Sequence, residues 1–151
     1  MPPLALENQV LDLLVQKVNE FPQASWRTSP KPTAVEGTPL DPLPEGDSPV
    51  LRVQWIDTRE SRAEDAAGTT VTAHGFRCRL IAWCIAKSVH AATELMADVR
   101  DVLYASEGAF TSSFQQPAWT TGGRYRDDLS DAGKHVVELP IFMDFESLHA
   151  A

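Results

Sequence analysis

Residues 71–106 constrain the fold more than any other part of the chain, because no other segment is both so long and so apolar. The stretch predicts a strand at 76–87 and an amphipathic helix at 88–106, for which Ser88 is a suitable N-cap. Apolar positions of the helix recur at steps of three and four residues and form its core stripe. The acidic residues of this helix are expected to face water; they are Glu94, Asp98 and Asp101.

The predicted strand is expected to be covered on both faces. Along 76–87, apolar side chains occupy every second position, with Arg77 and Arg79 on the opposite face. From Ile81 onward this second face becomes apolar as well, and it includes Trp83. A strand that is apolar on both faces is usually buried on both. We therefore expect one face to meet a helix of the same chain, and the other to meet either more of the chain or another subunit.

Composition limits the classes of function. The chain has 151 residues, of which 43% are hydrophobic, and this suits one soluble domain with a sizeable core. Its net charge of −8 argues against specific nucleic-acid binding, because phosphates favour a basic surface. No membrane span and no signal peptide are expected. Cys78 and Cys84 lie six residues apart on one strand, roughly 20 Å, which is too far for a disulfide. Two buried free thiols fit a reducing cytoplasm.

The remaining segments complete an α+β domain. We expect a mainly antiparallel β-sheet with a long hairpin, packed against two α-helices. The expected segments of this single domain, 1–151, are an N-terminal helix at 1–21, a proline-rich loop without regular structure at 22–49, the hairpin at 50–87, the helix at 88–106, an irregular segment at 107–132 and a C-terminal strand at 133–146.

Two residues in these segments carry specific expectations. Trp26 is the one large side chain of the proline-rich loop, and a core or lid contact is favoured over a partner contact. Pro140 interrupts the alternating C-terminal strand and cannot donate to a ladder. That strand should therefore lie at an edge, be bulged, or have Pro140 turned away from its partner.

The sequence carries no catalytic signature, so we expect neither an enzyme nor a cofactor. It contains no GxSxG, GxxxxGK[ST] or GxGxxG motif. The candidate metal ligands are His74, Cys78, Cys84 and His90, which lack CxxC or HxxxH spacing. The acidic turn from Asp127 to Asp131 does not match a calcium loop, and it is expected to be a solvated surface.

The tip of the hairpin, expected at 58–68, has charges that alternate in sign. Such a tip is either a solvated turn or a surface that interlocks with another copy or a neighbouring protein. The charged residues concerned are Arg59, Glu60, Arg62, Glu64 and Asp65.

The order of the elements resembles a known family. A first helix, a proline-rich loop, a long hairpin with a charged tip, a helix containing AATELMADVRDVL and a final strand containing KHVVELPIFMDFE are similar to the tail terminator proteins of long-tailed bacteriophages. These are also called tail completion or minor tail protein U-like proteins. The resemblance covers essentially the whole chain and rests on the order and size of its elements.

This resemblance implies a structural virion protein, assembled in the host cytoplasm, without cofactor or catalysis. It would form a ring, hexameric in the family, that caps the tail tube, ends its polymerisation and joins it to the head-side neck. The implied partners are other copies of the chain, the tail tube protein and a head–tail connector or neck protein. The genome would pass through the ring without specific binding. Interface candidates are the charged tip residues together with Trp83, Arg124 and Arg126.

Two other classes remain open on the sequence. One is another neck, connector, sheath or baseplate protein of the same kind of particle. The other is a small enzyme or ligand-binding domain. A deep pocket with a strongly shifted carboxylate would favour the second class. Its site residues would be Arg124, Arg126, Asp127, Asp128 and His135.

Overall fold

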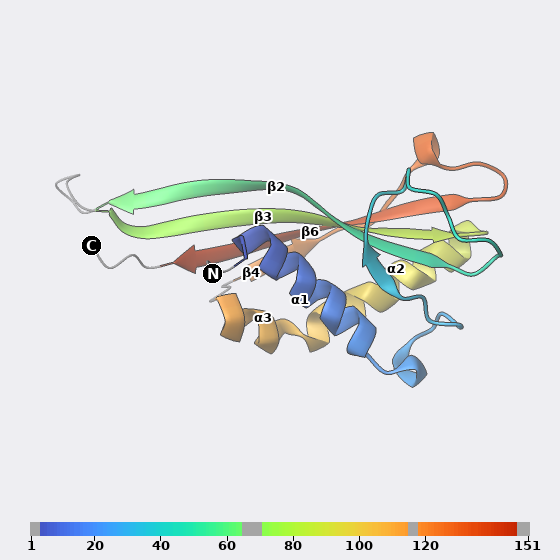
Figure 1. Ribbon diagram of the computed structural model, residues 1–151, viewed down its shortest axis with the longest axis horizontal. Coiled ribbons are helices and arrows are strands. Elements are labelled where there is room, and N and C mark those ends of the chain that lie inside the picture. Colours follow the sequence, from blue (N-terminus) through green and yellow to red (C-terminus); the bar gives the residue numbers. More distant parts are fainter. Residues whose placement is uncertain (1–3, 65–70, 115–117, 148–151) are drawn as a thin grey trace.

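A six-stranded sheet with helices on one face makes up the protein (Figure 1). The computed structural model describes residues 4–64, 71–114 and 118–147, and the side-chain surroundings of residues 4–60, 75–110 and 121–144. The helices are α1 (Leu6–Glu20), α2 (Val89–Ala105) and α3 (Glu107–Phe114), with 3-10 turns η1 (Gln23–Ser25) and η2 (Asp127–Leu129). The strands are β1 (Ala34–Glu36), β2 (Val50–Glu64), β3 (Val71–Ala86), β4 (Ala118–Thr121), β5 (Arg124–Tyr125) and β6 (His135–Ser147). The predicted α+β class, with a mainly antiparallel sheet and a long hairpin, is confirmed.

The strands follow the order β1-β2-β3-β6-β4, and β5 also pairs with β6. Among the strands of the described residues, β1 pairs with β2 in parallel and the other pairs are antiparallel. The final strand β6 is therefore interior rather than an edge. Thr121 pairs with Ile141 and Arg124 with Glu138, so Pro140 lies beside the break between β4 and β5. On the edge of β6 away from β3, Pro140 therefore has no paired residue in β4 or β5. A residue without a backbone N–H is tolerated at such a position.

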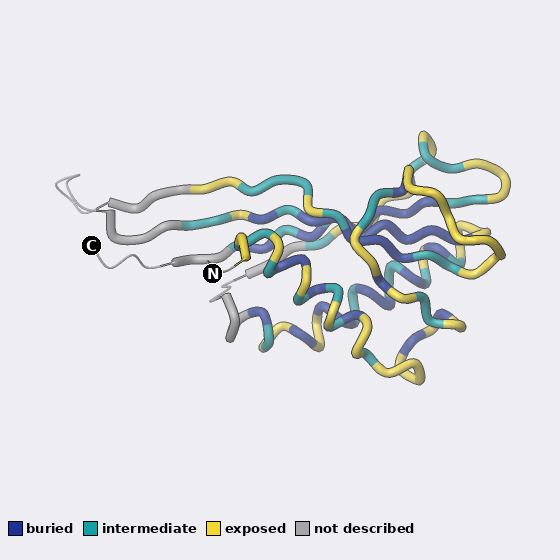
Figure 2. Tube along the Cα trace, viewed as in Figure 1, coloured by how far each residue is buried: buried dark blue, intermediate teal, exposed yellow. Residues whose placement is uncertain are grey.

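The main core lies between the sheet and the helices. Val10 and Leu14 of α1 and Leu95 and Val99 of α2 are fully buried against the sheet, in the same core as Leu80 of β3. Figure 2 shows buried segments, in dark blue, along both helices and the central strands. Burying each such side chain stabilises the fold by about 1.5–3 kcal/mol. Ser88 caps α2 as expected, since its Oγ accepts from the N–H of Ala91. We call the sheet face in this core the inner face and the opposite one the outer face.

A second, smaller cluster covers part of the outer face. Ile81, Trp83 and Ile85 pack with Val136, and Leu129 of η2 lies against them. The second apolar face of β3 therefore meets more of the same chain at these positions. Trp83 is only 5% exposed within a single chain.

Two segments are more regular than their composition predicts. The proline-rich segment contains η1 and the short strand β1, and Trp26 is buried in the main core as expected. The segment 107–132, expected to be irregular, contains α3, β4, β5 and η2. α3 is short and includes Gly108, Thr111 and two serines, so its local helix propensity is poor. Complete burial of Phe110 in the main core explains how packing stabilises α3 nevertheless.

The first hairpin strand, expected at 50–57, is longer than predicted, whereas the returning strand, expected at 69–87, is observed as β3. Residues 58–64, expected to belong to the tip, continue β2, and β3 pairs with them from Val71 onward. Trp55 pairs with Leu80 and Asp57 with Arg79, so Ile56 is an extra residue in a bulge. Because of this bulge, Asp57 rather than Ile56 faces Arg79 on the outer face.

The two cysteines are free and buried, which predicts low thiol reactivity in the folded protein. Burial raises the pKa of Cys78 to about 11, and it also raises the pKa of Cys84. Less of the reactive thiolate is therefore present at pH 8 in the folded protein than in the unfolded chain. We expect no rapid labelling by a thiol reagent at pH 8 until denaturant unfolds the chain, when both thiols should react. Rapid labelling of either thiol in buffer would contradict this burial.

Candidate interaction surfaces

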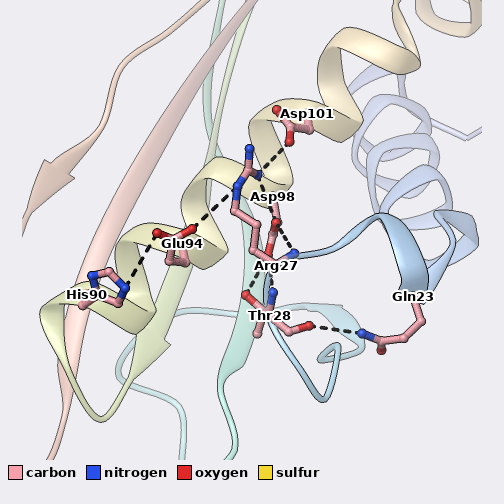
Figure 3. A network of polar contacts seen from close by, with 7 residues as sticks. All are labelled: Gln23, Arg27, Thr28, His90, Glu94, Asp98 and Asp101. Atoms are coloured by element: carbon pink, nitrogen blue, oxygen red, sulfur yellow. Dashed lines mark hydrogen bonds and ion pairs between the residues drawn. The ribbon is translucent and has the colours of Figure 1, made fainter.

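A buried carboxylate holds the proline-rich segment against α2 (Figure 3). Asp98, predicted to face water, is instead 1% exposed. Its Oδ1 accepts from the backbone N–H of Arg27 at 2.9 Å and from Arg27 Nη1 at 3.2 Å. Its Oδ2 accepts from the N–H and the Oγ1 of Thr28, at 3.0 and 2.6 Å. Arg27 also donates to Asp101 at 2.7 Å, and the hydrogen bonds to Asp101 and Asp98 raise the pKa of its guanidinium. This network fixes the direction in which the segment leaves η1.

A buried arginine then fixes the next part of the same segment. Arg52, on the outer face of β2, donates through Nη1 to the carbonyls of Thr38 (3.1 Å) and Asp41 (2.7 Å), and through Nη2 to Pro42 (2.6 Å). Gly37 is needed for this close approach, because a Cβ there would lie 2.8 Å from Asp41 Oδ2 and 3.2 Å from Arg52 Cδ. Arg52 thereby holds residues 40–47, which we call the acidic ridge.

Replacing Arg52 with lysine is expected to loosen the acidic ridge. A single ammonium cannot reproduce the planar fork that reaches three carbonyls, so two of these hydrogen bonds should be lost. The expected cost is about 1–3 kcal/mol in the free energy of unfolding. Hydrogen exchange of peptides spanning 37–49 should become faster. Arg124→Lys is the matched control, because the Arg124 side chain is 72% exposed. This variant should leave hydrogen exchange of the peptides spanning 37–49 unchanged. Unchanged exchange in Arg52→Lys would contradict the role given to Arg52.

Three predicted interface residues come together on the outer face. Arg126 Nη1 donates to Glu138 Oε2 at 2.9 Å, and its guanidinium lies 5.6 Å from the Trp83 ring centroid. Arg124 approaches Glu138 at 4.0 Å. Asp128 binds Arg126 through two hydrogen bonds of 2.9 and 2.7 Å, which lower the pKa of Asp128 and raise that of Arg126. We call these charged residues, Arg124, Arg126, Asp128 and Glu138, the Arg126 cluster. The cluster covers the smaller core and leaves Arg124 exposed, while Trp83 is only 5% exposed beneath it.

Several residues of the ligand-binding alternative contact one another or neighbouring side chains. Asp128 is occupied by Arg126, and His135 Nδ1 lies 2.9 Å from the Tyr125 hydroxyl. One surface hollow, of about 50 Å³, is lined by residues near Gly46, Lys87 and Lys134. A second, of about 190 Å³, lies elsewhere on the outer face. Neither is lined by the five residues proposed for such a site.

The larger hollow is a charged groove, which we call the arginine groove. Its lining residues are Asp57, Arg59, Arg77, Arg79 and Phe142. Arg79 donates to Asp57 at 2.7 Å. At the rim, Arg77 binds Asp144 through hydrogen bonds of 2.9 and 3.3 Å, and the same contact raises the pKa of Arg77. From the sequence, Arg77 and Arg79 were expected opposite the apolar face of their strand, whereas Arg59 was expected in the hairpin tip. The combination depends on the Ile56 bulge and on the pairing of β6, which no local pattern indicates.

The other predicted interface residues lie on the hairpin. Arg59 and Glu60 are exposed, and Arg59 lines the arginine groove. Arg62 and Glu64 belong to the continuing strand β2. Asp65 lies outside the described residues. The structure therefore separates the predicted set into the Arg126 cluster and the hairpin.

The described residues contain neither a candidate metal site nor a candidate membrane-spanning helix. Within 4–64, 71–114 and 118–147, no group of three or more His, Cys, Asp or Glu residues is placed to hold a metal ion. In the same ranges, no helix combines the length and apolar character needed to cross a bilayer.

Comparison with known proteins identifies the fold. No protein-family model matches the sequence, and no curated protein matches it. Seventeen chains of solved structures match the fold. One belongs to the structure described as "Virion of native gene transfer agent (GTA) particle" and is 13% identical, with a TM-score of 0.50. The match covers 95% of this chain and 96% of that one. At such low identity the likeness shows a shared fold.

Proposed function

We propose that the chain is a structural protein of a phage-like virion and, within it, a tail terminator that caps the tail tube. The observation that carries this proposal is the fold shared with a chain of a gene transfer agent virion, end to end in both chains. The order of elements, which resembles the tail terminator family, supports the more specific role. In this role the chain would form a ring, end tube polymerisation and present its other side to a neck protein.

The chemistry of the surface is compatible with this mechanical role. The overall charge of −8 would disfavour trapping of a genome that passes through the ring. The charged side chains of the Arg126 cluster bind one another, and neither of the two hollows described above is lined by this cluster. Localisation in the virion, after assembly in the host cytoplasm, follows from the same proposal.

Negative-stain electron microscopy of the purified protein, with and without tail tubes assembled from the tube protein of the same particle, tests the proposal. We expect caps at one end of each tube and tubes that no longer lengthen. Rings with a central hole at high protein concentration would support the same role. Bare tubes that continue to grow would overturn the terminator role. Binding to isolated neck or baseplate assemblies, with bare tubes, would indicate another structural position in the particle.

A further inference from the structure

We infer that the arginine groove of one copy receives the acidic ridge of the next copy, so that the chain associates head to tail. This inference deepens the proposed function and rests on it, because it names the contact through which a ring would form. The partner is a second copy of this chain, and the argument for it is complementarity of charge and shape between two surfaces that one chain cannot join.

The arginine groove is a basic site on an acidic protein. Three guanidinium groups line it or form its rim, against the carboxylates of Asp57 and Asp144. Arg59 is exposed, and no ion pair of Arg59 is found with the described residues. Phe142 supplies an apolar surface between these charges. A ligand for this groove should therefore combine carboxylates with an apolar side chain.

The acidic ridge has this combination. Between Leu40 and Asp47 the chain carries three carboxylates and no lysine or arginine. Asp47 pairs with Lys87 and Asp41 accepts from the Thr38 N–H, so Glu45 is the carboxylate offered to a partner. Leu40 is 79% exposed, which is unusual for a leucine, and Glu45 is exposed beside it. Arg52 holds the Asp41 and Pro42 carbonyls near one end of the ridge, and Lys87 pairs with Asp47 at the other end, so little ordering would be needed on binding. We expect Leu40 to contact Phe142 and Glu45 to pair with Arg59.

The two surfaces cannot meet within one chain. Arg52, which holds the ridge, precedes Arg59 by seven residues on the same face of β2, a separation of roughly 23 Å along a strand. Within one copy, therefore, the exposed Arg59 of the groove cannot reach the exposed Glu45 of the ridge, although Arg77 and Arg79 have carboxylate partners in the same chain. Contact between two unlike patches is heterologous, and repeated rotation of such a contact closes a ring or generates a filament. Charge complementarity would favour this relative orientation of two copies over other orientations.

Disulfide trapping tests the contact directly. In the double variant Arg59→Cys/Glu45→Cys, mild oxidation at high protein concentration should give a ladder of covalent oligomers on non-reducing gels. The single variants should give dimers at most, because one cysteine cannot link successive copies. The native Cys78 and Cys84 are buried and should not contribute. The same oxidation is repeated with tail tubes present, where the ring would be assembled. Absence of a ladder under both conditions would overturn the inference.

A charge swap provides an independent test. Arg59→Glu and Glu45→Arg should each weaken self-association about tenfold or more, since a charge pair becomes a like-charge contact. The double variant restores opposite charges at every contact and should recover most of the loss. Lys17→Glu/Glu20→Lys is the control, because this pair lies within α1, away from both surfaces, and should leave association unchanged. Sedimentation at increasing concentration measures the effect.

The association experiments and the tube-capping experiment together distinguish failure of the head-to-tail contact from failure of the terminator role. If double charge reversal fails to restore association while the native protein still caps tubes, the head-to-tail contact is wrong and the terminator role remains. If ladders form but tubes stay bare, the contact is supported and the terminator role fails.

Discussion

Replacing Asp98 with alanine is expected to lower the free energy of unfolding by about 3–5 kcal/mol. The change removes one buried carboxylate and leaves the N–H groups of Arg27 and Thr28 without their acceptors. Burying an unsatisfied donor costs about 1–3 kcal/mol, and two backbone donors and a hydroxyl are affected here. Urea unfolding monitored by tryptophan fluorescence measures the loss. Trp26 lies next to this network and reports on the same region.

Asp101→Ala is the matched control for this prediction. Asp101 lies on the same helix and binds the same Arg27, but its side chain is 43% exposed. An exposed ion pair contributes about 0–1 kcal/mol, so the control should lose no more than this. Equal losses in the two variants would show that burial of Asp98 does not explain its contribution. Asp98→Asn keeps one acceptor oxygen but turns an NH₂ group toward donors, so it should fall between the two.

Replacing Trp83 with aspartate is expected to unfold the protein or to leave it insoluble. The change removes a buried aromatic side chain, for which truncation costs about 3–5 kcal/mol. It also places a carboxylate directly opposite Glu138, the cross-strand partner of Trp83. Together these costs approach the 5–15 kcal/mol that stabilises a typical domain. Circular dichroism and size-exclusion chromatography of the expressed variant measure the outcome.

Trp83→Phe separates packing from hydrogen bonding at this position. It keeps an aromatic ring beneath Arg126 but loses the bond from the Trp83 indole N–H to Gln54 Oε1, which measures 3.0 Å. The expected loss is about 1–2 kcal/mol with a native spectrum. A soluble, folded Trp83→Asp monomer would mean that Trp83 serves a subunit contact rather than the core.

Regular spacing of apolar residues in the sequence correctly predicted the long strands and the two longer helices. The apolar pattern of 76–87 predicted a strand covered on both faces, and β3 contributes side chains to both the main core and the smaller cluster. A strand or helix with one buried face places apolar residues at every second position, or at every third and fourth position. This spacing can be read directly from a short stretch of sequence. α3 and β1 were not predicted because contacts with distant parts of the chain, rather than local propensity, stabilise them. Burial of Phe110 in the main core is such a contact for α3.

The candidate surfaces were harder to predict than the fold. An acidic residue at the position of Asp98 normally faces water, and only the approach of Arg27 and Thr28 from a distant segment explains its burial. Likewise, Arg52 looks like a solvent-facing strand residue until the proline-rich segment returns over it. The bulge at Ile56 moves Asp57 onto the outer face. Each of these features requires a contact between segments far apart in the sequence.

The central place of β6 has a consequence for synthesis of the protein. A nascent chain that has reached residue 134 already contains β3, but one edge of that long apolar strand still lacks its partner. Unpaired apolar edges recruit strands from other chains. The inner core cannot close either, because α2 packs on β6 as well as on β3. Folding must therefore wait for residues 135–147, and molecules truncated before them should aggregate rather than form a smaller stable domain.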